Sequence, residues 1–186
     1  MNSPKELIVL LGENLNEVGT APKLESHSAN TPLHKGFSCY VFDKKGRFLV
    51  TRRALSKKVW PGVWTNSLCG HPGPDESHES AIKRRAREEL GAKLTDIQIV
   101  IKDYRYKTPP YNGIIENELC PVFVARLVGN LHPNPDEVKE YMWNSWSDFV
   151  ADIKNHPAKY AYWTKDQMRL LSNHSNLLGY AKSTIL

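Results

Sequence analysis

Cysteine is scarce in this sequence, and its few copies are poorly placed for a disulfide framework. The 186 residues contain three cysteines, Cys39, Cys69 and Cys120, which are odd in number and widely spaced. Secreted domains that depend on disulfides carry paired cysteines at short spacings. We therefore expect reduced thiols and a cytoplasmic protein.

Long apolar runs are also missing. The longest, such as Leu7–Leu11, fall far short of the about 20 residues that a transmembrane helix needs. No basic segment precedes a signal-like apolar core, so we expect neither a secretory peptide nor a membrane partner. Repeats, low-complexity tracts and linkers are absent as well. We expect a single domain over residues 1–186, which is long enough for a substantial core.

Acidic residues are outnumbered by basic ones, 20 to 25, so the formal net charge is +5. The basic residues form no long tail, and nucleic acid is not an expected partner. They lie in short clusters, Arg52–Arg53, Lys57–Lys58 and Lys83–Arg87. A solvated surface can explain any one cluster, but together they suit a small anionic substrate, above all a phosphate ester.

A Gly/Pro-rich loop near the middle of the chain leads into a charged helix. Ile82, Ala86 and Leu90 recur at four-residue spacing and predict the buried face of that helix. Asp75 is the expected N-cap, and Gly91 fits the residue just after the C-cap.

Strand patterns flank this helix on both sides. We expect a hairpin turn at Asp43–Gly46 and helices that begin near Ser147 and Thr164. The expected strands are Leu7–Leu11, Gly36–Asp43, Phe48–Thr51, Ile97–Ile101, Asp103–Tyr106, a long one at Ile114–Leu127, and Asp136–Trp143. Strands mixed with a few helices predict a layered α/β or α+β domain.

Two glutamates and three histidines are candidate metal ligands. Glu116 and Glu118 are two residues apart in an expected strand, so their side chains should leave the same face. A metal ion is one reason to keep two like charges together, and a solvated strand face is the alternative. His27 and His34 alone could each be an ordinary surface or core histidine, whereas His71, near Cys69 in a glycine loop, is more suggestive. Together the five could form an octahedral site for Mn²⁺, Mg²⁺ or Zn²⁺.

Cys69 differs from the other thiols in its surroundings. Cys39 and Cys120 fall in apolar strand patterns and are expected to be inert core residues. Cys69 is followed by Gly70 and His71 in a loop, where it could be a nucleophile, a metal ligand or a proton donor. No Cys-His-Asn protease pattern is present.

Residues 70–92 largely match the Nudix box, G-x5-E-x7-R-E-U-x-E-E-x-G-U, where U is aliphatic. The positions in register are Gly70, Glu76, Arg84, Glu88, Glu89 and Gly91, with Ala86 and Ala92 at two aliphatic positions. Arg85 stands where the box has a metal-binding glutamate. It shares a helix face with Glu88 and Glu89. A cation there weakens a multi-metal hydrolytic centre and adds a ligand for substrate phosphate.

Two longer segments, TRRALSKKVWPGVWTNSLCGHP and RYKTPPYNGIIENELCPVF, closely resemble type I isopentenyl-diphosphate isomerases of the Nudix superfamily. The similarity reaches HSANTPLH and the region of Trp163, so it covers nearly the whole chain. It implies a Nudix-type mixed β-sheet core sandwiched between helices. Residues 1–35 would carry metal-ligand histidines, and residues 69–92 would be a modified Nudix box. It also implies interconversion of isopentenyl and dimethylallyl diphosphate by proton addition and removal.

The resemblance assigns roles residue by residue. Cys69 and Glu118 would transfer protons, with Tyr106 hydrogen-bonding near Glu118. The implied metal ligands are His27, His34, His71, Glu116 and Glu118, with Glu89 holding a second Mg²⁺ together with the substrate diphosphate. The implied substrate-binding residues are Lys23, Arg53, Lys57, Arg85 and Trp163. Plainer roles remain open for three of these: core for Trp163, surface for Lys23, and strand structure for Tyr106.

Two other functions compete with the isomerase. A Nudix hydrolase of a nucleoside diphosphate derivative would release phosphate, and Arg85 counts against it. A catalytically silent metal- or diphosphate-binding module would lack acid and base groups, whereas Cys69, Tyr106 and Glu118 are present. The expected partner is a small diphosphate substrate, and the expected assembly is a monomer or a weak homodimer.

Overall fold

A computed structural model describes residues 6–182 of the chain. The strands are β1 (Leu7–Leu11), β2 (Glu17–Pro22), β3 (His34–Lys35), β4 (Phe37–Phe42), β5 (Phe48–Arg53), β6 (Trp64–Thr65), β7 (Leu68–Gly70), β8 (Lys93–Ile101), β9 (Arg105–Lys107), β10 (Asn117–Leu119), β11 (Val122–Val128) and β12 (Val138–Asn144). The helices are α1 (Lys23–Ser26), α2 (His78–Leu90), α3 (Trp146–Asn155), the 3₁₀ helix η1 (Pro157–Lys159), α4 (Tyr162–Leu171) and α5 (Ser175–Tyr180).

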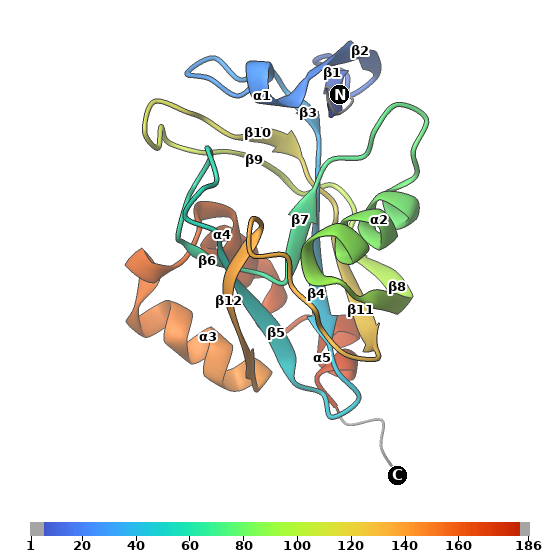
Figure 1. Ribbon diagram of the computed structural model, residues 1–186, viewed down its shortest axis with the longest axis vertical. Helices are drawn as coiled ribbons and strands as arrows, with labels where there is room; N and C mark the ends of the chain where they lie inside the picture. The colour runs from blue at the N-terminus through green and yellow to red at the C-terminus, as the bar shows by residue number, and fades with distance from the viewer. Residues whose placement is uncertain (1–5, 183–186) are drawn as a thin grey trace.

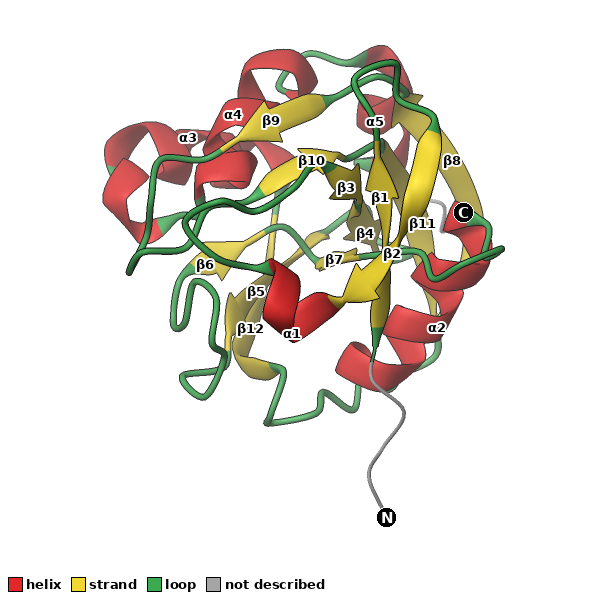
Figure 2. Cartoon of the chain, turned by 90° about the horizontal axis from the view of Figure 1, so that it is seen from above, coloured by secondary structure: helices red, strands yellow, loops and turns green. Residues whose placement is uncertain are grey.

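A mixed, seven-stranded sheet forms the centre of the molecule (Figure 1). Its main order is β12-β5-β4-β11-β8, with β6 on β5 and β7 on β4. Helix α2 packs on one face through a cluster that includes Ile82 and Leu90, and α3, α4 and α5 pack on the other. Every residue of β4 is therefore buried. Figure 2 shows α2 on the side of the sheet opposite α3 and α4. The expected mixed α/β sheet between helices is confirmed.

A second sheet, in the order β2-β1-β3-β10-β9, lies at one end of the first. Two chain segments run from one sheet into the other, β3 into β4 and β10 into β11. Strand β3 pairs in parallel with β10, with His34 opposite Glu118. Strand β4 pairs in parallel with β11, with Ser38 opposite Val122. Side chains of these strands that lie at the junction of the two sheets can point into one common space.

The prediction of one long strand over Ile114–Leu127 is wrong. The chain instead forms β10 and β11, which belong to different sheets. Pro121 lies at the break and has no N–H to donate to a sheet. Glu116 also lies outside the strand, directly before β10, and its backbone N–H donates to Oγ1 of Thr108.

The middle helix is confirmed, but its expected N-cap is wrong. Ser77 caps α2, and its hydroxyl accepts the backbone N–H of Ser80. Asp75 instead adopts a left-handed conformation with φ of 57° in the preceding turn. Gly91 ends the helix at φ 57°, as its position after Leu90 predicts.

The helix expected near Ser147 is confirmed as α3, which begins at Trp146 with Ser145 as its cap. The last expected helix begins at Tyr162 and is divided into α4 and α5. The region between residues 11 and 34, which lies outside the expected strands and helices, contains β2 and α1. The part of the single-domain prediction that covers residues 1–5 and 183–186 lies outside the described residues. No helix within residues 6–182 is long and apolar enough to cross a membrane.

Candidate functional site

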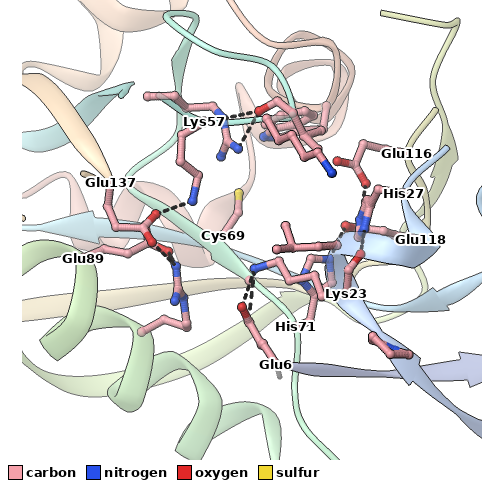
Figure 3. A pocket seen from close by; sticks show the side chains of 18 of the residues that line it. Glu6, Lys23, His27, Lys57, Cys69, His71, Glu89, Glu116, Glu118 and Glu137 are labelled. Atoms are coloured by element: carbon pink, nitrogen blue, oxygen red, sulfur yellow. Dashed lines mark hydrogen bonds and ion pairs between the residues drawn. The ribbon is translucent and has the colours of Figure 1, made fainter. Parts of the chain in front are cut away.

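A cavity of about 580 Å³ is lined by residues of both sheets and of three helices (Figure 3). Strands β9 and β10 supply Tyr106 and Glu118 from one sheet, and β7 supplies Cys69 from the other. The remaining candidate residues that line it are Lys23, His27, Arg53, Lys57, His71, Arg85, Glu89, Glu116 and Trp163. His34, the last candidate, is fully buried and belongs to the histidine cluster beside the cavity.

Three histidine rings meet although they are far apart in the sequence. His27 follows α1, His34 opens β3, and His71 follows β7. Their ring centroids are 5.0 to 5.5 Å apart. His34 is brought to Glu118 by the parallel register of β3 and β10. The structure thus brings these side chains together, which spacing in the sequence could not establish.

Each histidine faces a carboxylate. Nε2 of His27 lies 3.2 Å from Oε2 of Glu116. Nε2 of His71 lies 3.0 Å from Oε1 of Glu118, and Nε2 of His34 lies 3.6 Å from the same oxygen. All of these groups are buried.

Backbone carbonyls fix the tautomer of two of these rings. Nδ1 of His27 donates to the carbonyl of Lys23 at 2.6 Å, and Nδ1 of His34 donates to the carbonyl of Pro32 at 2.9 Å. A carbonyl can only accept, so Nδ1 carries the proton in both rings. In a neutral ring the lone pair of Nε2 then faces a carboxylate oxygen. A cation must lie between the two acceptors, whether a proton or a metal ion.

Burial and hydrogen bonding set the charge states of His71 and Glu118. It lowers the pKa of His71 to about 3, so this imidazole is neutral. Burial alone would raise the pKa of Glu118, but the neighbouring rings of His34 and His71, the latter through a hydrogen bond, hold it well below its usual value. Neutral imidazoles and ionised carboxylates are the protonation states that metal ligands require.

The donor set fits a divalent cation. Nε2 of His34, Nδ1 of His71 and Oε2 of Glu116 are buried without a hydrogen-bond partner, which is costly unless something else binds them. Ligand atoms of His27, His34 and His71 lie within 4.8 Å of one another, as do those of His34, Glu116 and Glu118. Mixed nitrogen and oxygen donors suit first-row divalent ions and Mg²⁺.

Cys69 lies on β7 opposite Ser38 of β4. Burial raises the pKa of its thiol to about 12, so the sulfur is protonated at neutral pH. Figure 3 shows its side chain between the Lys57–Glu137 ion pair and the cluster around His71 and Glu118. Of the three roles that the sequence left open, proton donor is the one that a protonated thiol suits. Cys39 and Cys120 are buried, as expected.

The basic side chains that line the cavity include Lys23, Arg53, Lys57 and Arg85, and three of these four are paired with carboxylates. Lys23 binds Glu6 at 2.9 Å, Lys57 binds Glu137, and Arg85 binds Glu89. These are the residues to which the resemblance assigns the diphosphate.

Arg53 is held differently. Its guanidinium donates to the carbonyls of Val59 and Trp60. It also lies over the ring of Trp163, 5.9 Å from the centroid. A polyanion entering this cavity would therefore meet cations that are already held in place.

Glu6 and Glu137 line the same cavity, although the sequence did not predict either of them as a site residue. Neither belongs to a motif, and Glu137 is 80 residues from its partner Lys57. No local pattern could connect such a pair. Both carboxylates have a pKa below the usual value; burial opposes this shift, and the nearby lysines outweigh burial.

Two aromatic side chains complete the cavity. Trp163 is only 4% exposed, and its Nε1 donates to Oγ1 of Thr65 at 2.9 Å. Oη of Tyr106 donates to Oε2 of Glu118 at 3.1 Å, and its ring lies 6.3 Å from that of Trp163. An indole face and a hydrogen-bonded carboxylate thus share the same cavity.

The fold is shared with solved structures of low sequence identity. A crystal structure of a Deinococcus radiodurans protein superposes with a TM-score of 0.68 at 19% identity, covering 89% of this chain and 99% of that one. A MutT protein from Methanosarcina mazei gives a TM-score of 0.59 at 20% identity, covering 78% and 96%.

Sequence comparison identifies the family. The NUDIX domain model matches residues 32–167. An isopentenyl-diphosphate Delta-isomerase of Kocuria rhizophila is 49% identical over 90% of this chain and 93% of its own. Another, of Mycolicibacterium vanbaalenii, is 47% identical over 89% and 91%. The chain therefore belongs to the Nudix superfamily and, within it, to the isopentenyl-diphosphate Delta-isomerase family.

Proposed function

We propose that this protein interconverts isopentenyl diphosphate and dimethylallyl diphosphate. The observation that carries the proposal is one cavity with four kinds of group: a protonated thiol, a buried carboxylate, an indole face and paired basic side chains. Metal-dependent hydrolysis of a diphosphate needs no thiol. The relatives that carry the isomerase name match along nearly their whole length, which supports the same activity here.

The chemistry requires a proton to be added to one carbon and removed from another. An unactivated alkene is a poor base, so its protonation needs a nearby acid and a site that excludes water. Cys69 and Glu118 are the proposed proton-transfer residues. Tyr106 keeps the Glu118 carboxylate oriented through its hydrogen bond. The face of Trp163 would stabilise positive charge that develops on the substrate.

The basic residues would bind the diphosphate. Lys23, Arg53, Lys57 and Arg85 surround the cavity, and binding energy from the diphosphate can orient the reacting carbons. The carboxylates Glu6, Glu89 and Glu137 must give up some of these cations when the diphosphate enters, or share them with it.

A divalent ion is the proposed cofactor. The residues that would hold it are His27, His34, His71, Glu116 and Glu118, with Mn²⁺, Mg²⁺ or Zn²⁺ as candidates. When bound, the ion neutralises this cluster and lowers the proton affinity of Glu118. A second ion, Mg²⁺, would be held by Glu89 and the substrate diphosphate.

Several properties remain predictions. They are a single domain over residues 1–186, a cytoplasmic location, a monomer or weak homodimer, and no nucleic-acid or membrane partner. The three free cysteines support the cytoplasm as the compartment.

The decisive experiment incubates the protein with isopentenyl diphosphate, Mg²⁺ and Mn²⁺ in D₂O and follows the reaction by NMR. We expect deuterium in the new methyl group of dimethylallyl diphosphate, and its loss in Cys69→Ala and Glu118→Gln. Phosphate release from a panel of nucleotides, without isomerisation, would instead identify a Nudix hydrolase. Tight metal binding with neither reaction would identify a binding module.

A further inference from the structure

A network of buried polar side chains surrounds the sulfur of Cys69. Sγ lies 3.0 Å from Oδ1 of Asn66 and 3.6 Å from Oγ of Ser38. Asn66 and Ser38 are both fully buried. Burying such groups is costly unless their hydrogen bonds are made, so the direction of each bond can be worked out from its neighbours.

Asn66 presents only an acceptor to the sulfur. Its Nδ2 donates to the carbonyls of Cys39 and Leu68, at 3.2 and 2.9 Å. Its Oδ1 accepts Nε1–H of Trp163 at 3.2 Å, and an indole nitrogen can only donate. The amide therefore cannot turn over. The bond between Cys69 and Asn66 needs the thiol proton, with sulfur as the donor.

Ser38 presents a donor to the sulfur. Oη of Tyr40 donates to Oε1 of Gln167 at 2.8 Å, and Nε2 of Gln167 donates to Oγ of Ser38 at 2.9 Å. Because Ser38 accepts this bond, its own proton is directed elsewhere. The two sulfurs within reach are Cys69 at 3.6 Å and Cys120 at 3.5 Å. A hydroxyl placed between two sulfurs donates to the one with more negative charge.

We propose that Asn66 and Ser38 are positioning residues for Cys69, one for each of its two protonation states. Asn66 holds the proton of the thiol, and Ser38 donates a hydrogen bond to the thiolate. This inference rests on the proposed isomerase function, in which Cys69 gains and loses a proton. Gln167 and Tyr40 act through Ser38 by fixing the direction of its hydroxyl.

Cys69 must pass through both its thiol and its thiolate form, because an isomerisation is reversible. In the direction in which Cys69 is the acid, its S–H bond breaks with the electron pair staying on sulfur, and the π pair of the substrate double bond forms a new C–H bond. A second C–H bond breaks, its proton goes to the base, and its electron pair forms the new double bond. In the reverse direction the thiolate takes the proton back. Sulfur thus needs an acceptor beside it before transfer and a donor beside it after transfer.

Asn66 also links the acid to the aromatic face. Its Oδ1 accepts from Cys69 and Trp163 together, so a single atom fixes the distance between the sulfur and the indole. The same oxygen accepts the hydroxyl proton of Thr65 at 2.9 Å. Loss of Asn66 should therefore disturb both side chains that face the reacting carbons.

The test compares Ser38→Ala with Ser67→Ala. Ser67 is also buried and lies between Asn66 and Leu68, but its hydroxyl binds the carbonyl of Leu49 and the amide of Val41, not the sulfur. We expect Ser38→Ala to lower kcat by about tenfold or more with KM unchanged, as for loss of a donor to a developing anion. We expect Ser67→Ala to keep kcat close to that of the wild type. Gln167→Leu should fall between them.

A spectroscopic measurement tests Asn66 without turnover. The S–H stretching band of Cys69 is the one lost in Cys69→Ser. We expect Asn66→Ala to shift this band to higher frequency, because its acceptor is gone, and Ser67→Ala to leave it in place. If Asn66→Ala does not fold, the comparison of kcat between Ser38→Ala and Ser67→Ala still tests the inference.

Equal kcat in Ser38→Ala and Ser67→Ala, or an unshifted S–H band in folded Asn66→Ala, would overturn the inference. Failure of the isomerase proposal has a different signature, since the wild-type protein would then form no dimethylallyl diphosphate at all.

Discussion

Arg85 and Glu89 form an ion pair inside the Nudix helix, with Nε of the arginine 2.9 Å from Oε1 of the glutamate. Nη1 of Arg85 also lies 2.9 Å from Glu88, and Nη2 lies 3.4 Å from Glu137. Burial would lower the pKa of Arg85, but Glu89 and Glu137 raise it, so the side chain stays charged. A guanidinium thus occupies the position at which the box has a third carboxylate, and it faces the cavity.

The first prediction concerns this guanidinium. Arg85→Lys keeps the charge but loses the planar fork that binds a phosphate through two donors. We expect KM for the diphosphate substrate to rise about tenfold, the equivalent of one charge-assisted hydrogen bond, with a smaller change in kcat. Steady-state kinetics measure both. Arg87→Lys, on the exposed side of the same helix, is the control and should match the wild type. An unchanged KM in Arg85→Lys would remove Arg85 from the diphosphate site.

The second prediction concerns the metal. His34 is fully buried, and its Nε2 has no hydrogen-bond partner. We expect His34→Ala to purify with less bound divalent metal than the wild type, as measured by elemental analysis. A chelator should lower the Tm of the wild type but not that of the variant. At free metal of about 100 times Kd, the lost stabilisation would be about 2.7 kcal/mol. His132→Ala, at an exposed histidine, should behave as the wild type does.

The third prediction concerns the backbone beside Glu118. Gly36 links β3 to β4, and a Cβ at this position would collide with the Glu118 carboxylate. Gly36→Ala must therefore displace that carboxylate. We expect strongly reduced isomerisation and reduced metal content, with the fold retained by circular dichroism. At Gly179 a Cβ meets nothing within 4 Å, so Gly179→Ala is the control. Full activity in Gly36→Ala would show that the position of Glu118 is not critical.

Local patterns predicted the elements whose signals lie within a few residues. The spacing of Ile82, Ala86 and Leu90 was sufficient for α2, because a buried stripe recurs once per turn. The N-cap was misassigned because Asp75 and Ser77 are two residues apart and both can cap. The strand Ile114–Leu127 was wrong because its apolar pattern could not show that the chain changes sheets at Pro121.

Local sequence patterns predicted less of the site than of the fold. The Nudix box and the two long matched segments pointed to Cys69, His71 and Glu118 through resemblance. Spacing could not show that His27 and His34 meet them, because a parallel strand pair and the end of α1 bring them together. Asn66 gave no signal, since its role depends on contacts across the sequence, such as the one to Trp163, 97 residues away.

The last prediction concerns pH and the segment that leads to Trp163. Asp152 of α3 accepts hydrogen bonds from Lys159 at 2.7 Å, from His156 at 2.7 Å and from Tyr160. The bonds from Lys159 and Tyr160 hold the pKa of Asp152 well below its usual value. A carboxylate with a lowered folded-state pKa stabilises the fold above its unfolded pKa of about 3.9, and this stabilisation is lost as pH falls toward the folded value.

Asp152→Asn should therefore be less stable than the wild type at pH 7, by less than about 1 kcal/mol because the site is near the surface. The difference should be unchanged down to about pH 5 and should shrink below about pH 4 as the carboxylate of the unfolded chain becomes protonated. Urea unfolding at a series of pH values measures it. Asp103→Asn, at an exposed aspartate, is the control. A stability difference that persists at the acid end would mean that Asp152 acts through packing rather than through its charge.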